Sequence, residues 1–319
     1  MTLQVENVRK SFNSVPAVQD VSLTVEEGEI FGFLGPNGAG KTTTIRMILN
    51  IYQPDAGRVL WQGRPAAATA RGLWGYLPEE RGLYPKMRVV DQLLFLTQLY
   101  GRSRSEAQRD VDYWLDRLQI TQNRNKRVDE LSKGNQQKVQ FLVAILHDPE
   151  ILLMDEPFSG LDPVNEKLLK DVLRELHARG KTIVLSTHEM SMVEELCQDI
   201  AIINRGQIVV AGGVREVRRS AGRKVVRLAL DDDPEIPWLD LLPGVTVTRR
   251  GQDYVELDLR APATPDLILR TALDRGGRVS LFQIADPSLN DIFIERVGGV
   301  AAAGLGSADA PVLQPVGAA

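Results

Sequence analysis

The chain carries a glycine-rich stretch between an apolar strand-like run and a helix-like run. Residues 35–42 read GPNGAGKT, which matches the spacing GxxxxGK[ST]. Glycines there let backbone N–H groups turn inward around phosphate oxygens, and the helix that follows adds the positive end of its dipole. Lys41 is expected to reach the β and γ phosphates of a nucleotide, and the Thr42 hydroxyl to ligate Mg²⁺. The predicted phosphate-binding residues are Gly35, Pro36, Asn37, Gly38, Ala39, Gly40, Lys41, Thr42 and Thr43.

Two carboxylates follow another apolar run, ILLMDEP at residues 151–157. Because side chains alternate along a strand, Asp155 and Glu156 are expected to point differently and to take different roles. We expect Asp155 to hold Mg²⁺ and Glu156 to polarise an attacking water. A further strand-like run, TIVLST at residues 182–187, ends at His188, which could donate a hydrogen bond to a γ-phosphate oxygen.

A second possible anion site lies in the stretch LSKGNQQKVQ at residues 131–140. Ser132 and Gly134 stand at an expected helix start, where free N–H groups and the helix dipole favour an anion. The same pattern is typical of an ordinary helix N-cap, with Ser132 as the capping residue. Since the chain offers one cradle lysine, the second site is interpreted as serving a nucleotide held by another copy.

Apolar patterning places these motifs on an α/β scaffold. The chain has 319 residues, of which 43% are hydrophobic, enough for a buried core and two domains. Strand-like runs at 3–8, 18–25 and 30–34 precede a region in which helical and strand patterns alternate. This alternation predicts an α/β domain with a largely parallel central sheet.

The composition changes after Gly213. A small α+β domain is expected at about 222–298, with strands near 224–230, 245–250, 253–259 and 279–285 and helices near 265–276 and 288–297. Residues 299–319 contain too few large apolar side chains to repay ordering, so they are predicted to form a disordered tail.

Charge and cysteine content narrow the class of protein. With 38 basic and 42 acidic residues, no global field attracts nucleic acid. The one cysteine, Cys197, cannot form an internal disulfide, and no Cys/His cluster has metal spacing, which fits a reducing cytoplasm. The start MTLQVENVRK has no apolar signal region, and no run approaches the roughly 18 apolar residues that span a bilayer. We therefore expect a cytoplasmic chain whose membrane role, if it has one, comes through a partner.

In order along the chain, five motifs resemble those of the ATP-binding cassette (ABC) ATPases. The phosphate loop (Walker A), Q-loop, signature, Walker B with D-loop, and His switch read GPNGAGKTT, YLPEERGLYP, LSKGNQQKVQ, LLMDEPFSGLD and STHEM. The resemblance covers about residues 2–215. It implies a P-loop NTPase cassette over 1–215, in which an N-terminal antiparallel β subdomain and a helical subdomain at about 79–145 flank the mainly parallel core sheet.

The resemblance also implies roles for residues outside the phosphate loop. In that family two cassettes close head to tail, so Ser132, Gly134 and Asn135 would act on a nucleotide held by the partner. Phe12 matches the aromatic residue that stacks on adenine, with a core phenylalanine of the first hairpin as the alternative. Asp162 matches the D-loop acid that faces the other protomer, and it can also be a helix N-cap.

Two motifs depart from the family pattern. The signature, usually LSGGQ, reads LSKGN, so Lys133 replaces a glycine and Asn135 a glutamine. The Q-loop glutamine is replaced by Glu79, which can still reach Mg²⁺ or the attacking water but brings a charge instead of an amide. YLPEERGLYPKM, and more weakly the region after Lys224, resemble the ATPases of sodium-extrusion and daunorubicin-resistance exporters and their accessory C-terminal domain.

This resemblance implies an ATP-hydrolysing subunit that energises an ABC transporter, using ATP and Mg²⁺. Its expected partners are a second cassette, with a homodimer favoured over a heterodimer, and a separate membrane permease, for export. The chain would then lie on the inner face of the cell membrane, docked through about residues 76–100. The alternative is a soluble ABC ATPase acting on ribosomes or DNA, but the chain has neither a second cassette with a basic linker nor a long coiled-coil insertion. A small-molecule P-loop kinase would leave the signature and the D-loop unexplained.

Overall fold

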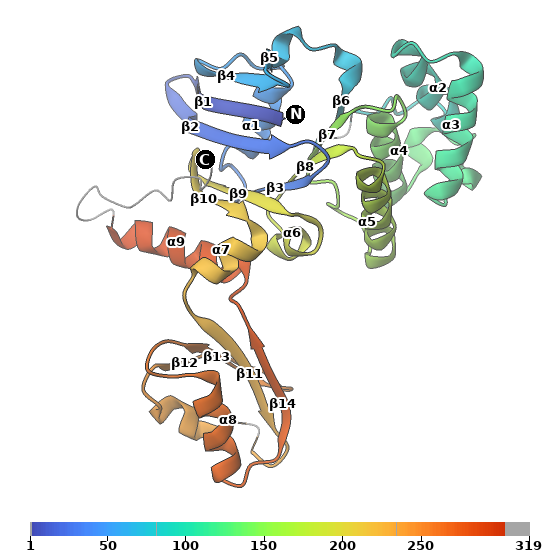
Figure 1. Cartoon of the computed structure of the whole chain (residues 1–319). Coiled ribbons are helices and arrows are strands. Elements are labelled where there is room, and N and C mark those ends of the chain that lie inside the picture. Colours follow the sequence, from blue (N-terminus) through green and yellow to red (C-terminus); the bar gives the residue numbers. More distant parts are fainter. Residues whose placement is uncertain (1, 81, 234, 304–319) are drawn as a thin grey trace. The chain divides into compact units, whose positions relative to one another are not determined.

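The computed structural model describes residues 2–80, 82–233 and 235–303. The polypeptide divides into two compact units, and the division falls between Gly213 and Val214. In Figure 1 the first unit runs from blue to yellow and the second from gold to red. Within the described ranges, no helix has the length and apolar character needed to cross a bilayer.

The first unit begins with an antiparallel sheet in the strand order β2-β1-β4-β5. Its strands are β1 (Thr2–Phe12), β2 (Val15–Glu26), β4 (Ala56–Trp61) and β5 (Arg64–Pro65). In β2, the buried Val21, Leu23 and Val25 alternate with exposed residues. This period of two leaves one face of the sheet against the core and the other in water.

A six-stranded sheet forms the centre of the first unit, in the order β10-β9-β3-β8-β7-β6. It consists of β3 (Ile30–Leu34), β6 (Trp74–Leu77), β7 (Ile151–Asp155), β8 (Thr182–Thr187), β9 (Asp199–Asn204) and β10 (Gln207–Gly213). All neighbours are parallel except β9 and β10. Every residue of β3, β7 and β8 is buried, which explains why each strand contains a run of apolar residues. The predicted mainly parallel sheet is confirmed.

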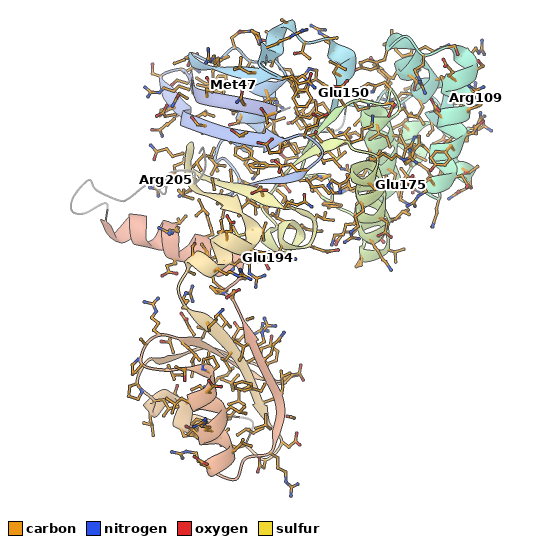
Figure 2. All side chains as sticks on the ribbon, in the orientation of Figure 1. Met47, Arg109, Glu150, Glu175, Glu194 and Arg205 are labelled. Atoms are coloured by element: carbon orange, nitrogen blue, oxygen red, sulfur yellow. The ribbon has the colours of Figure 1, made fainter. Side chains whose placement is uncertain are left out.

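Helices connect the parallel strands. They are α1 (Lys41–Ile48), α2 (Val89–Leu99), α3 (Arg104–Arg117), α4 (Lys133–Ile145), α5 (Pro163–Ala178) and α6 (Met190–Leu196). In Figure 1, α2, α3 and α4 gather beyond the β6 edge of the sheet. Glu175 on α5, labelled in Figure 2, accepts hydrogen bonds from Tyr113 and Arg117 on α3, each 3.0 Å long. Hydrogen bonds and packing thus join the helices at this edge.

The second unit is a four-stranded antiparallel sheet in the order β12-β13-β11-β14, with α8 packed against it (Figure 1). Its elements are α7 (Val214–Ser220), β11 (Lys224–Leu230), β12 (Val245–Arg250), β13 (Val255–Leu259), α8 (Pro265–Asp274), β14 (Val279–Ala285) and α9 (Leu289–Ala303). Its core includes Val226, Leu257 and Ile268. The expected small α+β architecture is confirmed. Helix α9 extends over the first residues of the predicted tail, and residues 304–319 of that tail lie outside the described residues.

Strand β6 has no clear signal in the sequence. It is four residues long and contains Gly75, which weakens a strand pattern. A Cβ atom at Gly75 would lie 2.4 Å from the Ala144 carbonyl oxygen of α4. The glycine therefore lets a helix backbone approach the strand closely, and this long-range requirement cannot be seen in the local sequence.

Candidate nucleotide-binding site

The phosphate loop joins the buried end of β3 to the start of α1. Gly40 adopts a φ of +112°, and a Cβ atom there would lie 2.7 Å from the Ala17 carbonyl oxygen. A side chain would meet both backbone strain and a clash, so glycine is required at this position. No capping side chain accepts a hydrogen bond from the N–H groups in the first turn of α1. Its free N–H groups and the helix dipole are therefore available to an anion.

The side chain of Lys41 is held inside this loop. It is buried, and its Nζ donates to the carbonyl oxygens of Gly35 at 2.6 Å and Pro36 at 3.3 Å. The same Nζ lies 3.7 Å from Oε1 of Glu156. The ammonium group thus stands between the phosphate loop and the carboxylate that follows β7.

Asp155 binds two hydroxyl groups. Its Oδ2 accepts from Thr42 Oγ1 at 2.6 Å, and its Oδ1 accepts from Ser186 Oγ at 2.8 Å. A threonine hydroxyl next to a carboxylate supplies the hard oxygen donors that Mg²⁺ prefers, while phosphate and water complete its shell. Because Thr42 and Asp155 supply only part of such a shell, these residues fit Mg²⁺ bound jointly with a nucleotide.

Glu156 is buried and fixed by three hydrogen-bonding contacts. Its Oε1 accepts from the His188 backbone N–H at 3.0 Å and lies 2.9 Å from His188 Nδ1. Its Oε2 accepts from Thr187 Oγ1 at 3.1 Å. The residue has a φ of +50°, a left-handed conformation that turns the chain sharply after β7. Asp155 and Glu156 thus differ in their partners, as their adjacent positions predict.

The two carboxylates and the loop line one pocket. Its lining residues are Ala17, Pro36, Asn37, Gly38, Gly40, Lys41, Thr42, Thr43, Glu79, Asp155 and Glu156. Gly35 and Ala39, also predicted here, are buried behind this surface. Sequence reasoning missed Ala17, Ser186 and Thr187. The two hydroxyls could have been found from their place at the end of the strand that precedes His188.

The predicted signature and D-loop residues form a second group. Ser132 caps α4 by accepting from the Asn135 N–H at 3.4 Å, and Asp162 caps α5 by accepting from two N–H groups at 3.0 Å. The hydrogen bonds that Asp162 accepts, first of all the one from the Asn165 N–H, lower the pKa of its carboxyl group. A Cβ atom at Gly134 would lie 3.6 Å from Asn165 Nδ2, so the two helix starts are neighbours. Ser132, Gly134, Asn135 and Asp162 do not line the pocket.

Phe12 lies at the end of β1 and is 40% exposed, which argues against a role as a core residue. Its ring meets that of Tyr52 edge-on, with centroids 5.3 Å apart, and Lys10 Nζ lies 5.7 Å from its centroid. Phe12 does not line the phosphate pocket. The partial exposure of Phe12 leaves it reachable by a base, as stacking requires.

Comparison with known proteins identifies the family. Residues 18–159 match the family model for ABC transporters, and residues 212–297 match the C-terminal domain of DrrA1-3-like ATP-binding proteins. The chain is 45% identical over 298 residues to YhaQ of Bacillus subtilis, an uncharacterized ABC transporter ATP-binding protein, covering 93% of this chain and 99% of YhaQ. The chain is an ABC transporter ATP-binding protein.

Other relatives of this ABC protein match its sequence over nearly the full length. It is 32% identical over 306 residues to the linearmycin resistance ATP-binding protein LnrL of Bacillus subtilis, covering 93% of this chain and 98% of LnrL. It is 33% identical over 300 residues to the Nod factor export ATP-binding protein I of Cupriavidus metallidurans, covering 93% and 97%.

A solved ATP-binding subunit of an ABC transporter superposes with a TM-score of 0.65 at 31% identity, covering 70% of this chain and 94% of that one. The predicted identity as an ABC ATPase is confirmed. None of these comparisons supports the alternative of an ATPase that acts on ribosomes or DNA. As a member of this family, the chain binds ATP and hydrolyses it to drive transport.

Proposed function

We propose that two copies of this ABC ATPase close head to tail around two ATP molecules and drive a separate membrane permease. The separation of the two residue groups carries the proposal. The first group surrounds a pocket within one chain, whereas Ser132, Gly134 and Asp162 lie together outside it. Helix starts favour anions, so in a head-to-tail pair the α4 start would meet the phosphates held by the partner.

In the first group each residue has a proposed task. Glu156 orients or deprotonates the attacking water. His188, which lies against the Glu156 carboxylate, donates a hydrogen bond to a γ-phosphate oxygen and helps to hold that water. Lys41 exchanges its loop carbonyl partners for phosphate oxygens and neutralises charge on them. Thr42, Asp155 and Glu79 would hold Mg²⁺, which when bound neutralises developing phosphate charge.

Phe12 is proposed to stack on adenine. Asn135 and Asp162 would line the nucleotide held by the partner, together with Ser132 and Gly134. Phosphate release would remove contacts shared by both protomers, so the pair would open. Opening and closing then supply the movement that a permease uses.

The permease is proposed to dock at about residues 76–100. Tyr84 and Leu99 are 51% and 65% exposed there, which gives an apolar partner helix something to bury. Leu83 and Met87, in the same segment, are half-buried. Unchanged co-purification with a permease after Leu83→Glu and Tyr84→Glu together would exclude this surface.

Docked on a permease, the chain would lie peripherally on the inner face of the cell membrane. Two relatives are named for linearmycin resistance and Nod factor export, which favours export.

Size-exclusion chromatography of the Glu156→Gln variant tests the pairing. We expect a monomer without nucleotide and a dimer with ATP and Mg²⁺, because the variant retains the ATP that joins the protomers. The same variant carrying Lys41→Ala is the control and should stay monomeric. A monomer under all conditions, with and without the permease, would contradict the head-to-tail pair.

A further inference from the structure

Helix α4 makes a buried contact with the segment that carries Glu79. Gln140 is 3% exposed, and its Nε2 donates to the carbonyl oxygens of Pro78 at 2.8 Å and Glu80 at 3.2 Å. These two carbonyls flank Glu79 on either side. Both partners only accept hydrogen bonds, so the amide nitrogen, not the oxygen, must face them. Oε1 of Gln140 is buried and has no hydrogen-bond partner in the described part of the chain.

A second contact joins the same helix to β6, the strand that leads to Glu79. One helical turn beyond Gln140, the Ala144 carbonyl oxygen would lie 2.4 Å from a Cβ atom at Gly75. The helix backbone and the strand therefore touch with no room for a side chain between them. Since α4 holds this segment at two points, a displacement of the helix must move the backbone on both sides of Glu79.

The contacting side of α4 also reaches the segment that directly follows Glu156. Gln137 is buried, and its Nε2 donates to the Pro157 carbonyl oxygen at 3.0 Å, directly after Glu156. Glu79 and Glu156 both line the nucleotide pocket. One helix, whose own start lies outside that pocket, thus holds the backbone beside two of its carboxylates.

We propose that Gln140 is a positioning residue that sets the place of the Glu79 carboxylate in the nucleotide pocket according to the position of α4. A side-chain amide suits this task because its NH₂ group donates two hydrogen bonds from a single rigid plane. The inference rests on the proposed function, in which Glu79 helps to hold Mg²⁺ and the start of α4 contacts the partner's nucleotide. Contact between the start of α4 and the partner's nucleotide would then shift the Glu79 carboxylate in the chain's own pocket.

Titration of Mg²⁺ into the full-length chain with a fluorescent ATP analogue tests the inference, with Glu156→Gln present to prevent turnover. Gln140→Met removes both hydrogen bonds and should weaken the apparent Mg²⁺ affinity about fivefold or more, because one net hydrogen bond corresponds to a change of about fivefold. Gln140→Glu should weaken it further, because its carboxylate would face two carbonyl oxygens. If Gln140→Met does not fold, Gln140→Asn retains an amide that is too short to reach both carbonyls.

Gln136→Met is the matched control. Gln136 lies on the same helix, and its Nε2 also donates to two backbone carbonyls, those of Val128 at 3.0 Å and Leu131 at 3.2 Å. Its loss should lower the melting temperature as Gln140→Met does, but should leave Mg²⁺ affinity unchanged. Glu79→Ala should weaken Mg²⁺ affinity and abolish the additional effect of Gln140→Met.

Equal Mg²⁺ effects of Gln136→Met and Gln140→Met would overturn the inference. So would a Gln140→Met effect that persists in full beside Glu79→Ala, or a Glu79→Ala variant with normal Mg²⁺ affinity. The proposed function fails separately, if the Glu156→Gln chain does not dimerise with ATP and Mg²⁺. Normal dimerisation with an inert Gln140→Met would remove only the role of Gln140.

Discussion

The starts of α1 and α4 have similar local chemistry and different surroundings. Each follows a glycine- or serine-bearing turn, and each begins with a lysine, Lys41 or Lys133. Lys41 is buried in the phosphate loop near Glu156, whereas Lys133 is exposed. The α1 start has no capping side chain, but Ser132 caps the α4 start. A helix start alone therefore does not make a site, and the groups that the fold brings to it decide its use.

The parallel sheet explains this difference. Strand β3 lies next to β8, and β8 lies next to β7, so the carboxyl ends of all three strands meet at one edge. That edge places the phosphate loop beside Asp155 and Glu156, at the crevice where open α/β sheets bind ligands. The start of α4 lies beside the start of α5 instead. It has N–H donors for an anion, and in the proposed head-to-tail pair the metal-binding and base residues would come from the other chain.

The largest effect is expected from exchanging the two lysines for alanine in turn. Lys41→Ala should reduce ATP hydrolysis by about a hundredfold or more, because charge developing on the phosphates loses a buried cation. Lys133→Ala should leave ATP affinity of the monomer unchanged. Steady-state ATPase assays measure the rate of hydrolysis, and equilibrium ATP binding measures the affinity of the monomer. A loss of ATP affinity in Lys133→Ala that equals the loss in Lys41→Ala would break the comparison.

A smaller effect is expected from Ser132→Ala. Hydrolysis should fall about tenfold, because a partner-facing donor and a helix cap are lost together. ATP binding to the monomer should not change. The control is Thr264→Ala, which removes a similar cap, since Thr264 accepts from the Leu267 N–H at the start of α8. It should lower stability by about 1 kcal/mol without altering hydrolysis. Weaker ATP binding by monomeric Ser132→Ala would place that serine at its own chain's nucleotide.

The smallest effect is expected at Glu29, which precedes the strand that carries the phosphate loop. Burial raises the pKa of Glu29 from 4.5 to about 7. The neutral carboxyl is favoured in the folded state, so its stabilising contribution is complete below pH 4.5 and is lost as the pH rises through 7. Glu29→Gln should therefore raise the free energy of unfolding at pH 8 by about 1 kcal/mol, after allowance for solvent screening. Melting temperatures at pH 5 and pH 8 check this. A gain of the same size at both values would mean that Glu29 does not titrate in this range.

Much of the first site can be predicted because each of its motifs is short and chemically self-contained. The glycines, Lys41 and Thr42 occupy one loop, and Asp155 and Glu156 end one apolar strand. Ser186 and Thr187 were missed because their partners lie 31 positions away in the chain. The amide of Gln140 was missed for the same reason, since its two acceptors are 62 and 60 positions away. Its own neighbourhood reads as an ordinary amphipathic helix.

The sequence by itself determined which groups could bind phosphate, hold Mg²⁺ and activate water, because those properties belong to residue types at short spacing. It also determined which strands are buried, because a short continuous apolar run is stable only when it is packed in a core. Tertiary structure alone decided which groups share a pocket. It placed Glu79 with Asp155 and Glu156, kept Ser132 and Asp162 apart from them, and tied α4 to the backbone around Glu79. These contacts depend on strand order and helix packing, which arise from the chain as a whole.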